Sequence, residues 1–70
     1  MTTQKQSEPR HKRLKRLRIQ AGFVTQQELA DEISVSRNSI SNYERGLIDP
    51  GFTYEFFLRE MVKANAAKLA

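Results

Sequence analysis

Apolar residues recur at helical spacing in several stretches of this 70-residue chain, and small or polar residues separate those stretches. In the first stretch, Leu14 and Leu17 share one face of a helix that can start at Pro9, where the missing N–H of proline costs nothing. Gly22 then provides a left-handed stop. The pattern predicts a first helix over about residues 9–21.

The clearest start signal belongs to a second helix, predicted over about residues 26–33. Thr25 and Glu28 form a capping box, in which each side chain can bind a free backbone N–H at the helix start. Val24 and Leu29 occupy the flanking positions of a hydrophobic staple.

A third helix is predicted over about residues 37–45, with Ser36 as its N-cap and Gly46 after its end. Ile40 and Tyr43 form its apolar face, and we expect Tyr43 in the core. The connection from the second helix has only about three residues. Two short capped helices joined in this way form the helix-turn-helix arrangement.

The remaining segments complete a small all-α bundle of four to five short helices. A turn at residues 49–51 precedes a fourth helix, which is predicted to begin near Thr53 and to run to Met61 or beyond. The chain is expected to divide into three parts: a disordered polar arm over 1–8, one helix-turn-helix domain over 9–62, and a helical or frayed C-terminal tail over 63–70.

Composition narrows the class of protein. The chain has no cysteine, which excludes disulfides and thiolate zinc sites. Its longest apolar run is far shorter than the roughly 20 residues that cross a bilayer, so we expect a soluble, cytoplasmic protein. Residues 1–18 hold seven of the twelve Lys and Arg residues but one of the eight acidic residues. A polyanion, either nucleic acid or an anionic membrane surface, would be attracted to that end.

The third predicted helix carries the functional signal on its outward face. Arginine can donate two hydrogen bonds to a guanine edge, and asparagine can do the same to adenine. Polar residues at i, i+1, i+4 and i+5 share this face, which has no apolar reason to be buried. These four candidate base-reading residues are Arg37, Asn38, Ser41 and Asn42.

The stretch LKRLRIQAGFVTQQELADEISVSRNSISNYERG, followed by a turn with Pro50, resembles the Xre/Cro-repressor family of helix-turn-helix proteins over roughly residues 10–62. The resemblance implies a lambda-repressor-like fold and a transcriptional regulator, most simply a bacterial or phage repressor. It also implies sequence-specific binding of double-stranded DNA, with the helix at 37–45 in the major groove. The expected target is an inverted repeat, bound by a homodimer.

The resemblance implies further roles residue by residue. Gln26, Ser36 and Arg45 stand where family members meet phosphate, and Arg18 and Glu44 match a pair that forms an internal salt bridge in some members. Two departures stand out. The segment 23–25 is one residue longer than the usual connection. Ser34 stands where the family usually has Gly in the turn.

The basic first helix allows more than one interpretation. Lys12 and Arg13 could form part of a solvated helix face or contact phosphates, and we expect a mixture of both. A membrane-bound amphipathic helix is disfavoured, because the helix lacks aromatic anchors and its leucines are needed for the core.

The C-terminal segment leaves an alternative function open. Aromatic and apolar residues lie on more than one side of the fourth helix, so part of them should form an exposed patch at Phe56, Phe57 and Met61. That patch could hold a homodimer together or serve a protein-interaction module, such as an anti-repressor or antitoxin-like adaptor. An enzyme is not indicated, because the single histidine, His11, has no partners for catalysis or metal binding. No cofactor is expected.

Overall fold

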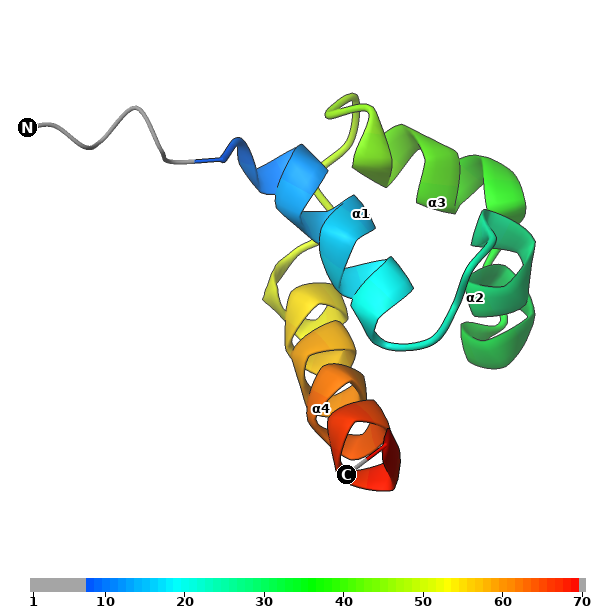
Figure 1. The fold of residues 1–70 in the computed structure, drawn as a ribbon. Coiled ribbons are helices and arrows are strands. Elements are labelled where there is room, and N and C mark those ends of the chain that lie inside the picture. Colours follow the sequence, from blue (N-terminus) through cyan, green and yellow to red (C-terminus); the bar gives the residue numbers. More distant parts are fainter. Residues whose placement is uncertain (1–7, 70) are drawn as a thin grey trace, which may run out of the picture.

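A computed structural model describes residues 8–69, which form four helices and no strand within that range. The helices are α1 (Arg10–Gln20), α2 (Gln26–Ile33), α3 (Arg37–Glu44) and α4 (Phe52–Leu69). Figure 1 shows α1 between the long α4 on one side and α3 on the other, with α2 packed against α3. The predicted all-α helix-turn-helix fold is confirmed, with four helices in the part of the chain described.

A single core joins the four helices, because each contributes one completely buried aliphatic side chain. These side chains are Leu14 of α1, Leu29 of α2, Ile40 of α3 and Leu58 of α4. Burying such a side chain contributes roughly 1.5–3 kcal/mol. The periodic apolar positions of the sequence therefore meet at one place, and they leave the opposite face of each helix to solvent.

Local capping sets the start of α2. The backbone N–H of Glu28 donates to Oγ1 of Thr25 over 3.1 Å, and the N–H of Thr25 donates to Oε1 of Glu28 over 3.0 Å. Both halves of the predicted capping box are thus present. The expected staple contributes little, because Val24 is 69% exposed while Leu29 is buried.

The turn between α2 and α3 contains a backbone conformation that favours glycine. Ser34 adopts the left-handed region with φ 58°, and it is the one non-glycine residue with positive φ among those described. The next helix begins after Ser36, whose Oγ accepts the backbone N–H of Ser39 over 3.0 Å. The turn is therefore formed with serine at the position where the resembling family usually has glycine, at a cost of order 1 kcal/mol.

Helix α4 runs well beyond Met61, the nearest end that its apolar pattern allowed. It begins one residue before the predicted start and continues to Leu69, so most of the predicted tail is helical. Asn65 fastens this extension to α1, since its Nδ2 donates to the carbonyl oxygen of Gln20 over 3.0 Å. None of the helices described is both long enough and apolar enough to cross a membrane.

The predicted aromatic patch on α4 needs correction. Phe57 packs against the core and Met61 is half-buried, so neither belongs to a fully exposed surface. The exposed pair is Phe52, at 76%, with Phe56, at 50%, and their ring centroids lie 5.9 Å apart. Phe52 and Phe56 are four residues apart and share one face of α4, whereas Phe57 is turned to the face that packs on the core with Leu58.

Candidate DNA-binding surface

The outward face of α3 is polar and accessible. Arg37 and Asn38 are exposed, and Ser41 and Asn42 are half-buried. Within residues 8–69, none of these four side chains makes a hydrogen bond or an ion pair, so their donors and acceptors remain available to another molecule. The opposite face holds Ile40 in the core, and this burial keeps the polar face turned outward.

The two ends of α3 carry different kinds of polar group. At the start, the Ser36 hydroxyl already caps the helix and donates to Oγ of Ser39 over 2.9 Å. At the end, Arg45 is exposed, and no acidic side chain in the described range pairs with it. Arg45 is therefore the freer of the two candidate phosphate ligands that flank α3.

The structure brings together Arg18 and Glu44, the two residues matched to an internal salt bridge. Nε of Arg18 lies 2.7 Å from Oε2 of Glu44, and the two side chains are 4% and 3% exposed. Gln26 joins them, because its Nε2 donates to Oε1 of Glu44 over 3.0 Å. The candidate phosphate ligand at the start of α2 is thus bonded to the last residue of α3.

Arg18 also holds the long connection between α1 and α2. Its Nη1 donates to the carbonyl oxygens of Phe23, over 2.9 Å, and Val24, over 2.7 Å. Two consecutive carbonyls of the connection therefore have a charged donor. This is how the connection, although one residue longer than usual, is kept against the end of α1.

An ion cluster that the sequence did not reveal centres on Glu55 of α4. This carboxylate is buried, and it accepts hydrogen bonds from Arg10 over 3.0 Å, from Arg13 over 2.9 Å and from Arg59 over 2.8 Å. The Arg13 hydrogen bonds are the main cause that lowers the pKa of Glu55 to about 2, against the opposing effect of burial. The sequence could have indicated this buried carboxylate in one way, because Glu55 stands between Tyr54 and Leu58, which are both buried.

Much of the basic charge at the start of the chain is therefore paired internally. Arg13 is tied to Glu55, and Arg16 binds Glu8 over 2.8 Å. Lys12 and Lys15 are exposed and have no acidic partner among the residues described. Lys12 is therefore more available to a phosphate than Arg13, although the sequence pattern assigned both residues the same expected role.

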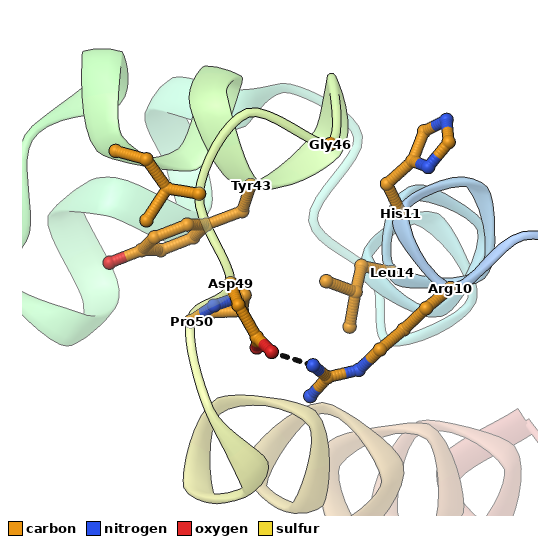
Figure 2. A pocket seen from close by; sticks show the side chains of 8 residues that line it. Arg10, His11, Leu14, Tyr43, Gly46, Asp49 and Pro50 are labelled. Atoms are coloured by element: carbon orange, nitrogen blue, oxygen red, sulfur yellow. Dashed lines mark hydrogen bonds and ion pairs between the residues drawn. The ribbon is translucent and has the colours of Figure 1, made fainter.

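The start of α1 lies close to the end of α3. Arg10 reaches from α1 to Asp49 in the loop after α3 (Figure 2) and also donates to the carbonyl oxygen of Gly51 over 2.8 Å. A Cβ on Gly46 would lie 3.1 Å from Nδ1 of His11, so the imidazole rests directly on this end of α3. The pocket between them has a volume of about 200 Å³, below the roughly 300–1,000 Å³ of usual ligand sites.

Comparison with known proteins agrees with this architecture. The family described as "Helix-turn-helix domain" matches residues 11–70. The chain is also 49% identical, over 39 residues, to the HTH-type transcriptional regulator ImmR of Bacillus subtilis (strain 168); the match covers 56% of this chain and 30% of that regulator. No solved structure matches the chain. The chain belongs to the helix-turn-helix domain family, in the Xre type that its sequence resembles.

Proposed function

We propose that the protein is a transcriptional regulator that binds double-stranded DNA sequence-specifically, with α3 in the major groove. The observation that carries this proposal is the face formed by Arg37, Asn38, Ser41 and Asn42. These side chains are accessible and lack partners within residues 8–69, on a helix whose other face is buried. A helix with such a polar face fits the width of the major groove.

Two of these residues have the chemistry to read base edges directly. Arg37 is the first residue of α3, the end that usually reaches the bases in this motif, and it can bind O6 and N7 of guanine. Asn42 can bind N6 and N7 of adenine. Asn38 and Ser41 contribute further contacts on the same face, either to bases or through water.

Phosphate contacts would set the position of α3 in the groove. We assign them to Gln26, Arg45 and Lys12, and to Ser36 once its hydroxyl proton turns from Oγ of Ser39 to a phosphate. Arg45 and Lys12 are exposed cations without an acidic partner in the described range. Arg13 joins this set only if DNA displaces it from Glu55, which makes it the weakest member.

The protein would act as a homodimer on an inverted repeat, and as a repressor. One recognition helix reads only a few base pairs, whereas two copies related by a two-fold axis read two half-sites about 34–36 Å apart. The resemblance to Xre/Cro repressors favours repression over activation.

Selection from a pool of random duplexes tests the proposal. We expect enrichment of a short inverted repeat whose half-sites are separated by about one helical turn. Enrichment of a single half-site would support DNA reading and exclude the dimer. If no sequence is enriched, DNA reading fails, and the exposed pair Phe52 and Phe56 favours the second candidate function, a protein-interaction adaptor.

A further inference from the structure

We infer that Glu44 is a positioning residue for DNA binding, which acts by holding the Gln26 side chain in place for a phosphate. The inference rests on the proposed function and adds to it a physical link between the buried ion pair and the DNA-contacting surface. It concerns three side chains from three helices: Arg18 of α1, Gln26 of α2 and Glu44 of α3.

The Glu44 carboxylate is held on both oxygens. Oε2 accepts from Nε of Arg18 over 2.7 Å, while Oε1 accepts from Nη2 of Arg18 over 3.3 Å and from Nε2 of Gln26 over 3.0 Å. Arg18 is itself anchored by its two bonds to backbone carbonyls. Because Arg18 and Glu44 are both buried, the carboxylate is a fixed acceptor for Gln26.

A fixed carboxylate determines which end of the Gln26 amide points inward. The amide nitrogen has two N–H donors, and the carboxylate can bind only that nitrogen, not the amide oxygen. One N–H is used by Glu44, and the second remains for another acceptor. Gln26 is half-buried at the first position of α2, so the residue is open to solvent on one side. Phosphate oxygen is an acceptor that this second N–H can bind.

The same arrangement explains how the long connection is tolerated. An extra residue before α2 would otherwise leave the position of Gln26 undetermined. Arg18 binds the carbonyls of Phe23 and Val24, and Glu44 binds Gln26 itself, so both sides of this stretch are held by one ion pair. The start of α2 is thereby set relative to α3, the helix proposed to read bases.

A double-mutant cycle on the selected duplex tests this link. The cycle compares wild type, Gln26→Met, the joint variant Arg18→Met/Glu44→Met, and the variant with all three changes. Methionine matches the side-chain length of glutamine and glutamate and is shorter than arginine, and replacing both members of a buried pair by apolar residues is often tolerated. We expect Gln26→Met to weaken DNA binding about tenfold in wild type and less than about twofold in the joint variant.

The outcomes separate the inference from the proposed function. If wild type binds no duplex, the proposed function fails. If wild type binds but Gln26→Met costs the same factor in both backgrounds, the positioning role is wrong. Gln27→Met is the matched control, because the one side-chain bond of Gln27 within residues 8–69 is to Asp31 on the exposed surface. It should change affinity by less than about twofold.

A second measurement applies even if the joint variant does not fold. In wild type, the Gln26 side-chain amide signals can be assigned by their loss in Gln26→Met. We expect one amide proton to exchange slowly with solvent in the free protein, and the other to shift when the duplex is added. Amide signals that exchange freely, or that do not move on DNA binding, would overturn the inference.

Discussion

Nε of Arg18 lies 2.7 Å from Oε2 of Glu44, and this pair joins α1 to the end of the helix proposed to read DNA. Since both side chains are buried, removing one partner leaves an uncompensated charge in the core. We expect Arg18→Met alone to lower the free energy of unfolding by about 3–5 kcal/mol, and Arg18→Met/Glu44→Met together to lower it by clearly less. Urea unfolding measures both. A loss below about 1 kcal/mol for the single variant would show that the pair is effectively solvated.

Ser34 provides a test of backbone strain. Its φ of 58° costs a non-glycine residue about 1–2 kcal/mol, whereas glycine adopts it freely but loses about 0.5–1 kcal/mol more through chain entropy on folding. We expect Ser34→Gly to raise the free energy of unfolding by roughly 0.5–1 kcal/mol. Glu32→Gly, at an exposed position of α2, is the control and should lower it by a similar amount. Equal destabilisation by both changes would contradict the strain at Ser34.

Glu55 makes the stability of the fold sensitive to acid. Its pKa falls from an ordinary 4.5 to about 2 in the folded protein, chiefly through the Arg13 hydrogen bonds. A carboxylate with a lowered pKa stabilises the fold above its ordinary pKa, and this contribution is lost as the pH falls from about 4.5 towards 2. We expect Glu55→Gln to destabilise the protein at neutral pH. Its melting temperature should also change less with pH than that of wild type between about pH 4.5 and 2.

The control for this acid sensitivity is Glu60→Gln. Among the residues that the structure describes, the Glu60 carboxylate bonds to Lys63 alone, at the surface. The variant should retain the wild-type decline in melting temperature on acidification. If Glu55→Gln shows the same decline as wild type, the arginine cluster does not govern acid stability.

Lys12 and Arg13 are neighbours with different expected roles. Lys12 is an exposed cation, so Lys12→Ala should weaken binding to all duplexes and reduce the slope of log affinity against log salt by about 1 for each protomer bound. Arg13 binds Glu55, so Arg13→Ala should mainly lower the melting temperature and change the slope by much less. Binding titrations over a range of salt concentrations measure the slopes. A larger slope change for Arg13 than for Lys12 would reverse the assignment.

The sequence predicted those features of the fold that depend on residues close together in the chain, and it did not predict those that depend on distant residues. The start of α2 followed from Thr25 and Glu28, because a capping box forms between residues three apart. The cluster at Glu55 was not predictable, since Arg10 and Arg13 lie more than 40 positions away and meet it only when α1 packs on α4. For the same reason the inward face of Phe57 was missed, because only packing decides which stripe of α4 is buried.

The candidate site shows the same division. The polar face of α3 was predicted from helical spacing, and its four residues lie on that helix and are exposed or half-buried, whereas their contacts with bases stay predictions. Family resemblance, rather than spacing, suggested the Arg18 and Glu44 pair. Neither helical spacing nor the family resemblance predicted the hydrogen bond from Gln26 to Glu44. This bond depends on how the connection before α2 places Gln26 beside the end of α3.

The central claim is that α3 reads base edges, and the most direct test is a comparison of wild type with Arg37→Ala. Each protein would be titrated with the selected duplex and with every single base-pair variant of it. We expect wild type to lose about 1–3 kcal/mol of binding free energy when one particular G·C pair of a half-site is changed. We expect Arg37→Ala to lose its preference at that pair, and at its equivalent in the other half-site, while keeping its preferences elsewhere. If Arg37→Ala discriminates among all the variants as wild type does, Arg37 does not read a base and the orientation proposed for α3 is wrong.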